Sequence, residues 1–418
     1  MTGKVGVVVI GGGPAGISAA IAASVDGASV LLVEREARLG GKLKQTIHDR
    51  LELAYHSDRL TGPEYAFSLI ATLEQTNTFV LLQTFVSQIV RNDNIFQLTL
   101  CNRHGTIDVT AGSVVFATGC RELTACNIPI HGSRPAGLMT AGTAQYHMNI
   151  QGQLPSQRCL VLGSTDLGMT VSRRLAIEGA KVLGVYEAGQ SPNGLLQNVT
   201  ECLSDYDIPL SFSHTITRAF GTRRIVAGEI CRVDKSLNPI RGSEAVAKCD
   251  AIILAGGLIP ENTLAESLGV LLHGETKGPL CDQNFMTMTD GVYCCGNAQH
   301  INSSLGFVYE SGEIAGRSAA RFAHRERQLI TIHIGKEFLY SVPHSIDVDM
   351  LYGETTIFFR VKDTLKDATV KVLVNGNEVY AQQYAMLQRP EVQRIAVNLS
   401  STLTPDSRIE LIKEVSAK

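Results

Sequence analysis

Residues 4–36, KVGVVVIGGGPAGISAAIAASVDGASVLLVERE, contain the pattern that most clearly indicates the fold. Its apolar, β-branched run at Val5–Ile10 predicts a buried strand, and the Ala- and Ile-rich pattern after the glycines predicts a helix. A second strand is predicted at Ser29–Val33, and Glu34 follows it directly. A strand, a glycine-rich turn, a helix, a second strand and a terminal acid together indicate a dinucleotide-binding βαβ unit.

Each glycine of the G-x-G-x-x-G turn has its own mechanical role. Gly11 permits the tight turn from strand to helix, Gly13 lets a pyrophosphate approach the backbone, and Gly16 allows close packing of the helix on the strand. The phosphates then lie on free N–H groups at the positive end of the helix. Glu34 is placed to accept both hydroxyls of an adenosine ribose.

Composition narrows the class of ligand. The chain has 418 residues, enough for two or three domains, and a formal net charge of −3 with no long basic run. We therefore expect small-molecule ligands and neither a nucleic-acid partner nor a polybasic membrane patch. The apolar N-terminus is interrupted by glycines, unlike a signal peptide, and no stretch of about 20 apolar residues predicts a membrane span. A soluble, cytoplasmic protein is expected.

The ten cysteines contain no C-x-x-C pair. This excludes a zinc ribbon, the usual iron–sulfur ligand sets and a thioredoxin-type dithiol in its usual spacing, so no metal site is expected. Most are interpreted as ordinary buried thiols. A redox role is left open for two pairs, Cys120 with Cys126 and the adjacent Cys294 with Cys295.

The βαβ pattern occurs a second time. A strand is predicted at Arg158–Leu162, a helix from the next turn to about Glu178 and a strand at Lys181–Tyr186, followed by Glu187. Thr165 stands where the middle glycine is expected. Its branched side chain would crowd a pyrophosphate, and it disfavours positive φ.

The neighbouring Asp166 can cap the helix but would repel a phosphate. Two readings stay open: a site for NAD(H), in which Glu187 disfavours the 2′-phosphate of NADP, and a degenerate domain that keeps the fold without the ligand.

The remaining segments complete the pattern. Strands are predicted at Ser113–Phe116 and Ala251–Leu254, each running into a glycine turn, and a helix is predicted over 306–323. From Leu329 onward the segments alternate apolar and polar residues, and Asn375-Gly376 is a strong hairpin signal. This part is predicted to be a small all-β domain.

Taken together and in order, the motifs resemble the two-dinucleotide-binding-domain flavoproteins, the superfamily of thioredoxin reductase and the other pyridine nucleotide–disulfide oxidoreductases. The resemblance covers roughly residues 4–328. The motifs that carry it are GGGPAG with Glu34, LGGKL at 39–43, VVFATG at 114–119, LGSTDLG at 162–168 with Glu187, LAGGLIPEN at 254–262 and GVYCCGN at 291–297.

A narrower resemblance is to the FAD-dependent proteins associated with anaerobic glycerol-3-phosphate dehydrogenase, and more distantly to sarcosine oxidase α subunits. It is carried by LTGPEYA at 60–66, GCRE at 119–122, GSRPAGLMTAGTAQ at 132–145 and LIPEN at 258–262. The resemblance implies an α/β fold of two interleaved Rossmann-like three-layer domains plus the C-terminal all-β domain. The implied boundaries are 1–125 with 273–328 for a discontinuous FAD-binding domain, 126–156 for a connecting segment, 157–272 for an NAD(P)-binding-like domain and 329–418 for a β-sandwich-like domain.

The resemblance also implies the cofactors, FAD and NAD(H), and their contacts. The residues implied for FAD are Gly11, Gly13, Pro14, Ala15, Gly16, Glu34, Arg35, Gly41, Lys42, Val86, Thr118, Gly119, Gly296 and Asn297. Val86 would contact the adenine through its backbone. Asn297 stands where many relatives carry aspartate and keeps a carbonyl acceptor for a ribityl hydroxyl. The residues implied for the nicotinamide nucleotide are Gly163, Thr165, Asp166, Glu187 and Gly257.

Two departures bear on activity. In the narrower family a Cys-Ile-His sequence and a glycine-aromatic-glycine turn follow the GG-x-L motif, whereas this chain has Thr46-Ile47-His48 and then Leu51-Glu52-Leu53. The catalytic group is therefore unassigned, with His48, Cys120 and Cys126 as candidates. His300 is a further histidine near the flavin-facing motifs.

We predict an FAD-dependent oxidoreductase that passes hydride between NAD(H) and a small organic substrate or a partner redox subunit. The alternatives are a relay subunit with a degenerate nucleotide site and a flavin-free interaction protein. By analogy, the β domain would dock a partner subunit or a second protomer of a homo-oligomer.

Overall fold

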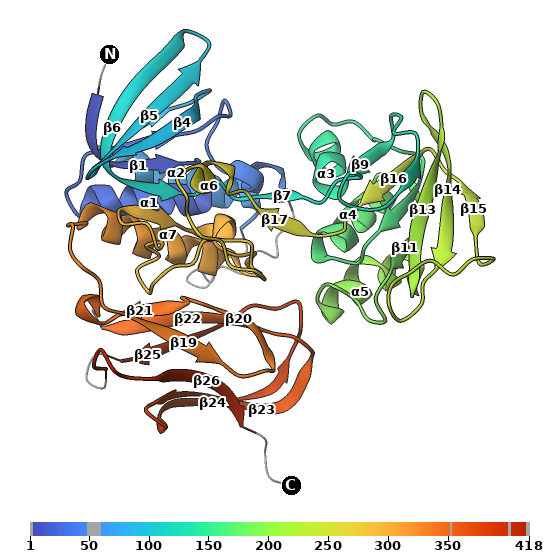
Figure 1. Ribbon diagram of the computed structural model, residues 1–418. Helices are drawn as coiled ribbons and strands as arrows, with labels where there is room; N and C mark the ends of the chain where they lie inside the picture. The colour runs from blue at the N-terminus through green and yellow to red at the C-terminus, as the bar shows by residue number, and fades with distance from the viewer. Residues whose placement is uncertain (1–2, 48–59, 352, 400–402, 415–418) are drawn as a thin grey trace. The chain divides into compact units, whose positions relative to one another are not determined.

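A computed structural model describes residues 3–47, 60–351, 353–399 and 403–414. His48 and Leu51–Leu53, which the sequence places near the flavin, lie outside these ranges. The chain forms two compact units, the first made of residues 1–120 and 260–418 and the second of residues 121–259 (Figure 1). The predicted domain boundaries at 125, 156, 272 and 328 remain predictions.

The first unit is built on a seven-stranded sheet in the order β3-β2-β1-β6-β5-β4, with β18 paired to β6. The VVVI run at the end of β1 is buried because β1 pairs in parallel with β2 and β6 at the centre of the sheet. β4, β5 and the long β6 form an antiparallel extension. The strands are β1 (Gly3–Ile10), β2 (Val30–Val33), β3 (Phe79–Leu81), β4 (Phe85–Asn92), β5 (Ile95–Asn102), β6 (Gly105–Phe116) and β18 (Val292–Cys294).

Small residues let two helices of this unit pack closely, as Figure 1 shows for α1 and α7. A Cβ added to Gly312 would lie 2.3 Å from the carbonyl oxygen of Ala15, and one added to Gly316 would lie 2.1 Å from that of Ala19. Larger side chains would therefore push the two helices apart. The helices of the first unit are α1 (Pro14–Val25), α2 (Gly62–Glu74), α6 (Thr263–Ser267) and α7 (Leu305–Ala320), with 3-10 turns η1 (Gly41–Gln45), η3 (Gly296–Ala298) and η4 (Val348–Met350).

The C-terminal segment forms two sheets, in the orders β21-β19-β26-β23-β24 and β20-β22-β25, over one shared apolar core. Asn375 and Gly376 both have positive φ, which turns β23 into β24 as the hairpin signal predicts. This confirms the predicted all-β region. Its strands are β19 (Leu329–Ile334), β20 (Phe338–Val342), β21 (Ser345–Asp347), β22 (Glu354–Val361), β23 (Leu365–Val374), β24 (Asn377–Leu387), β25 (Gln393–Asn398) and β26 (Ile409–Glu414).

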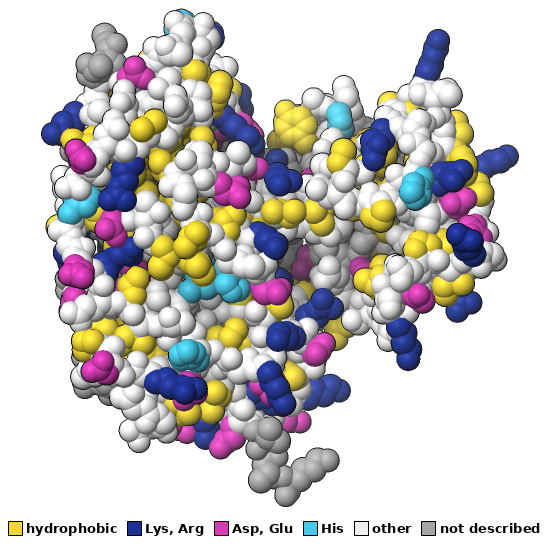
Figure 2. Space-filling view, viewed as in Figure 1, with side chains coloured by type: hydrophobic (Ala, Val, Ile, Leu, Met, Phe, Trp, Pro, Cys, Tyr) yellow, Lys and Arg dark blue, Asp and Glu magenta, His cyan; other side chains and the backbone are white. Residues whose placement is uncertain are grey.

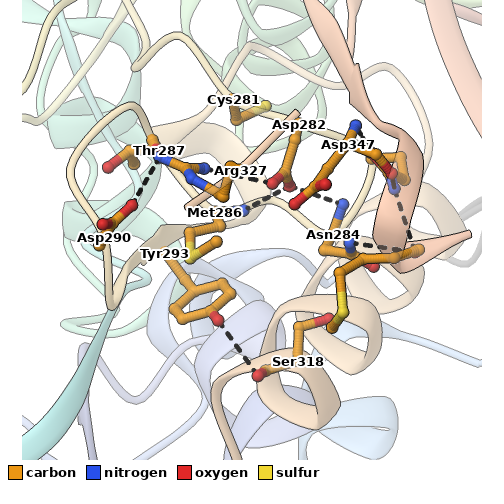
Figure 3. Close-up of polar contacts among 12 residues, drawn as sticks. Cys281, Asp282, Asn284, Met286, Thr287, Asp290, Tyr293, Ser318, Arg327 and Asp347 are labelled. Atoms are coloured by element: carbon orange, nitrogen blue, oxygen red, sulfur yellow. Dashed lines mark hydrogen bonds and ion pairs between the residues drawn. The ribbon is translucent and has the colours of Figure 1, made fainter. Parts of the chain in front are cut away.

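A buried ionic cluster anchors the connector between α7 and β19 (Figure 3). Arg327 lies 3.3 Å from a carboxylate oxygen of Asp282 and 2.9 Å from one of Asp290. Asp282, which is fully buried, also accepts hydrogen bonds from the amides of Asn284 and Met286. The guanidinium is therefore surrounded by acceptors before the chain enters the β domain.

The second unit repeats the βαβ arrangement. β10, β11, β12, β16 and β9 form a parallel sheet, and β13, β14 and β15 form an antiparallel layer to which β8 adds. The sequence did not predict this antiparallel layer. The elements are β8 (His131–Gly132), β9 (Leu138–Thr140), α3 (Ala141–Asn149), β10 (Arg158–Leu162), α4 (Asp166–Ile177), β11 (Lys181–Glu187), α5 (Leu196–Cys202), η2 (Ser204–Tyr206), β12 (Leu210–Phe212), β13 (His214–Gly221), β14 (Ile225–Arg232), β15 (Ala245–Lys248) and β16 (Ala251–Leu254). Two short strands, β7 (Cys120–Glu122) and β17 (Leu258–Pro260), lie where the chain passes from one unit to the other.

The mixed α/β architecture with two nucleotide-type sheets and a strand-rich C-terminal region confirms the predicted fold class. On the face shown in Figure 2, lysine and arginine side chains are interspersed with acidic ones. Within the described ranges, every helix is too short or too polar to cross a membrane.

Candidate functional site

A cavity of about 480 Å³ opens in the first unit at the end of β1 where the glycine-rich turn begins. Its wall brings together segments between Ile10 and Val308 that are far apart in the sequence, including the start of β4 and the N-terminal part of α7. The predicted FAD residues that line it are Gly11, Gly13, Pro14, Ala15, Glu34, Arg35, Gly41, Lys42, Val86, Thr118, Gly119 and Asn297. Their individual contacts with FAD remain predictions.

The three glycines of the first turn differ in what surrounds them. Gly11 has φ +109°, and a Cβ there would lie 2.4 Å from the carbonyl oxygen of Ala117. A Cβ on Gly16 would lie 1.8 Å from the carbonyl oxygen of Gly11. The site of a Cβ on Gly13, by contrast, has its nearest neighbour 4.0 Å away, at Gly41. Gly11 and Gly16 thus serve packing, whereas Gly13 leaves space that a pyrophosphate can fill.

Glu34, the residue directly after β2, is buried and holds the turn. One carboxylate oxygen accepts a hydrogen bond of 2.6 Å from the amide of Gly12, and the other accepts one of 2.7 Å from the amide of Glu36. A carboxylate has about four acceptor positions. Two remain for ribose hydroxyls, so the structure fits the predicted role of Glu34.

Charged and hydroxyl groups line the rim of the cavity. The Lys44 ammonium lies 2.6 Å from a carboxylate oxygen of Glu36. Burial raises the pKa of Glu36, but the hydrogen bond and charge of Lys44, together with the charges of Lys42 and Arg35, more than offset this, so the pKa lies below its ordinary value. Thr46, at the position where the narrower family carries a thiol, lines the cavity and donates a hydrogen bond of 3.0 Å to the carbonyl oxygen of Lys42.

The sequence missed three lining residues that belong to or follow the LIPEN segment. The Thr118 hydroxyl donates to the carbonyl oxygen of Glu261 at 2.6 Å, and the amide of Glu261 donates to the carbonyl oxygen of Gly119 at 2.9 Å. These bonds bring Glu261, Thr263 and Leu264 to the cavity wall. The motif was visible in the sequence, but no local pattern places it beside Thr118.

Asn297 reaches the cavity from η3, and its amide is already engaged. Its carbonyl oxygen accepts from the backbone amide and the side chain of Asn302 at 3.0 and 3.3 Å, while its nitrogen faces the Cys120 sulfur at 3.7 Å. Asn302 therefore competes for the acceptor that the sequence assigns to a ribityl hydroxyl. Gly296 has φ +62°, and a Cβ there would lie 2.7 Å from that of Ala15.

The cysteines separate into buried and accessible groups, and none of the ten is in a disulfide. Burial raises the pKa of the Cys295 thiol to about 12 and that of Cys294 well above its ordinary value. Thiolate is the reactive form, so this pair does not fit a redox role. Cys120 lines the cavity, and Cys126 is an exposed residue of the second unit.

The second turn reproduces the first in detail. Gly163 has φ +101°, and a Cβ there would lie 2.2 Å from the carbonyl oxygen of Ala255. Glu187 accepts from the Ser164 amide at 3.0 Å and from the Gly189 amide at 3.0 Å, as Glu34 accepts from Gly12 and Glu36. Gly257, also predicted for this site, has φ +125°.

Two expectations for this turn are wrong: that positive φ disfavours Thr165, and that Asp166 caps the helix. Thr165 has φ −66°, so positive φ is no obstacle, and Gly13 in the first turn has φ −79°. Thr165 itself caps α4 by accepting a hydrogen bond of 3.2 Å from the Gly168 amide. Asp166 is the first residue of α4 and bonds to a different segment, at the Leu195 amide and the Asn198 side chain.

Comparisons with known proteins agree with this architecture. An opine oxidase subunit of Agrobacterium tumefaciens is 26% identical over 347 residues, which cover 77% of this chain and 66% of that protein. Hydrogen cyanide synthase subunit HcnB of Pseudomonas aeruginosa is 24% identical over 343 residues, covering 77% and 71%. The sarcosine oxidase alpha subunit of a Corynebacterium strain is 26% identical over 42% of this chain and 19% of its own length. The chain thus spans just under two thirds of the opine oxidase relative.

Among solved structures, thioredoxin reductase of Lactococcus lactis superposes with a TM-score of 0.64 at 18% identity, covering 76% of this chain and 99% of that one. This likeness concerns the fold. The association with anaerobic glycerol-3-phosphate dehydrogenase remains a prediction. A family model described as pyridine nucleotide-disulphide oxidoreductase matches residues 5–315, about three quarters of the chain. The chain therefore belongs to the pyridine nucleotide-disulphide oxidoreductase family.

Proposed function

We propose that this chain is an FAD-dependent oxidoreductase that passes hydride between NAD(H) and a small organic substrate or a partner redox subunit. Members of its family bind FAD and NAD(P)H. The observation that carries the proposal is the cavity of the first unit, where Gly13, the N-cap residue of α1, leaves open space and Glu34 keeps two acceptor positions. When bound there, FAD supplies the two-electron chemistry.

The residues of the cavity divide the work of holding the cofactor. The amides at the start of α1, near Gly13 and Ala15, would bind the pyrophosphate at the positive end of the helix. Glu34 would bind the ribose hydroxyls, and Arg35 and Lys42 would supply positive charge near the phosphates. The Thr118–Glu261 hydrogen bond holds two segments of the cavity wall together.

The second turn supports NAD(H) as the nicotinamide nucleotide. Glu187 stands at the acid position and would accept ribose hydroxyls but repel the 2′-phosphate of NADP. Hydrogen bonds from Ser164 and Gly189 hold this carboxylate, much as Gly12 and Glu36 hold its counterpart in the first turn. NADH is therefore expected to bind more tightly than NADPH.

The group that exchanges electrons with the flavin is proposed from the cysteine spacing of this chain and from the names of its relatives. The sequence has no C-x-x-C dithiol, so disulfide reduction by the usual route is disfavoured. The opine oxidase and hydrogen cyanide synthase relatives are each named as a subunit, which supports a partner subunit for this chain too. An electron-relay subunit with a weakened nucleotide site is the second candidate, and Asp166 beside the second turn favours it. Our proposal includes a cytoplasmic location.

An anaerobic titration of the purified holoprotein with NADH and then NADPH tests the proposal. We expect NADH at low concentration to bleach the visible flavin band and NADPH to require more. A yellow protein that dithionite bleaches but neither nucleotide does would overturn the NADH route and leave the relay function. A protein that carries no flavin would overturn both.

A further inference from the structure

The two repeats can be aligned at their turns, their acids and the loops after those acids, and the charged residues near the turn differ: the first repeat has Arg35 and Lys42 where the second has Ala188 and Leu195. Gly41 follows Glu34 by seven residues, and Gly194 follows Glu187 by seven. At the first residue of the helix, however, α1 has Pro14 and α4 has Asp166. The second turn therefore has a carboxylate at the first residue of its helix, where the first turn has none.

Asp166 fastens a loop over the second turn. One carboxylate oxygen accepts a hydrogen bond of 2.8 Å from the Leu195 amide and one of 2.7 Å from the Asn198 side chain. The amide of Asn193 adds a bond of 3.0 Å to the Ser164 hydroxyl. We call residues 193–198 the latch segment.

The latch segment approaches the first residue of its helix more closely than the matching loop of the first repeat does. A Cβ on Gly194 would lie 2.7 Å from the amide nitrogen of Asp166 and 2.6 Å from its carboxylate. A Cβ on Gly41 would lie 3.9 Å from the ring Cδ of Pro14, although only 3.0 Å from the Cα of Gly13. The start of α4, where a pyrophosphate would bind, is thus approached by the chain's own backbone.

The charge of Asp166 and the hydrogen bonds already formed at the start of α4 both oppose the binding of a pyrophosphate there. A carboxylate at the first position of a helix stabilises that helix but repels an anionic ligand at the same end. The Gly168 amide, a donor of the first turn of α4, is already bound by Thr165. A pyrophosphate would meet both the Asp166 charge and a closed loop.

We propose that Asp166 determines the affinity of the second site for the dinucleotide by holding the latch segment closed and by placing a negative charge beside the pyrophosphate position. This rests on the proposed function, because it takes NAD(H) as the ligand of that site. Asp166 is a positioning residue, and nucleotide binding has to release its bonds to Leu195 and Asn198.

Three variants distinguish the effect of the Asp166 charge from the effect of its hydrogen bonds to the latch segment. Asp166→Asn removes the charge and keeps acceptors for both latch bonds. Asp166→Pro introduces the residue that the first repeat has at this position. It removes the charge and both latch bonds, and proline is well tolerated at the first helical residue. Asn198→Ala removes one latch bond and keeps the charge. Asp205→Asn, at an exposed aspartate of the same unit, is the matched control.

We would measure NAD⁺ binding to the oxidised holoprotein by calorimetry at low and high salt, with thermal unfolding of each variant as the folding check. Asp166→Asn should tighten binding about fivefold at low salt and less at high salt. Asn198→Ala should tighten it about threefold at both salt concentrations. Asp166→Pro should tighten NAD⁺ binding more than either of these variants, and Asp205→Asn should bind NAD⁺ as tightly as the wild type does.

If the wild type binds NAD⁺ and both Asp166→Asn and Asp166→Pro bind it equally well or more weakly, the inference is overturned. The proposed function is not. Binding by Asp166→Pro where the wild type shows none supports the inference and removes NADH as the electron donor of the natural chain. Absence of binding in every protein overturns both.

Discussion

The carboxylate of Glu34 accepts a 2.6 Å hydrogen bond from the amide of Gly12, so the acid that follows β2 holds the turn that follows β1. The same bond recurs in the second unit between Glu187 and Ser164 at 3.0 Å. Each acid therefore has a structural task in addition to the ribose contact proposed for it.

Replacing Glu34 should affect both stability and flavin content. Glu34→Ala leaves the amides of Gly12 and Glu36 without their acceptor, which we expect to cost about 2 kcal/mol of unfolding free energy. Flavin bound per chain should fall at the same time. Absorbance ratios and chemical denaturation measure the two effects, with exposed Glu74→Ala as the control. Full flavin occupancy in Glu34→Ala would remove the ribose role.

Two alanine substitutions in the first turn should have opposite consequences. A Cβ on Gly13 meets open space, so Gly13→Ala should fold with nearly normal stability and lose FAD because the methyl group occupies the pyrophosphate position. A Cβ on Gly16 would collide with the carbonyl oxygen of Gly11, and we expect Gly16→Ala to lose about 3 kcal/mol. Circular dichroism melts and flavin release by gel filtration distinguish the two. A Gly13→Ala protein that keeps FAD contradicts the placement of the pyrophosphate.

Arg327 should contribute more to the free energy of unfolding at neutral pH than in acid. Arg327→Met leaves the buried Asp282 carboxylate without its cation, a change expected to cost about 3 kcal/mol at pH 7. Burial raises the pKa of Asp282 to about 6 even with Arg327 present, so the folded state takes up a proton more readily than the unfolded state. Without the Arg327 charge the pKa of Asp282 rises further, so the deficit of the variant should shrink as pH falls toward about 6 and stay nearly constant below it.

Denaturation of Arg327→Met and the wild type at pH 5 and pH 7 tests this. Arg408→Met, which breaks an exposed pair with Glu410, should change stability little at either pH. An Arg327→Met deficit that is the same at both pH values would contradict the expectation.

His300 should contribute to acid lability. Burial, aided by the charge of Arg360, lowers the pKa of His300 from 6.5 to about 3. Between these values the unfolded state binds the proton and the folded state does not, so stability falls by about 1.4 kcal/mol for each pH unit below 6.5. His300→Gln should therefore lose less stability than the wild type between pH 6.5 and pH 4. Exposed His333→Gln should follow the wild type, and parallel wild-type and His300→Gln curves would show that His300 is not buried as a neutral ring.

Local patterns in the sequence predicted the βαβ units, their acids and twelve of the residues that line the cavity. These features depend on local rules, because a strand ending in spaced glycines can make only a few turns and strand, helix and acid are close along the chain. Gly11, Gly163, Glu34 and Glu187 were predicted on these grounds, and the structure places each at its turn.

Contacts between segments that are distant in the sequence depend on the assembled fold. Glu261 reaches the cavity through a bond to Thr118, and Arg327 finds Asp282 across 45 residues. The sign of φ at Thr165 and the bonds of Asp166 to the latch segment also depend on packing around the turn. Such pairings leave no periodic signal in the sequence, because their energy comes from groups that meet only once the sheets and helices have assembled.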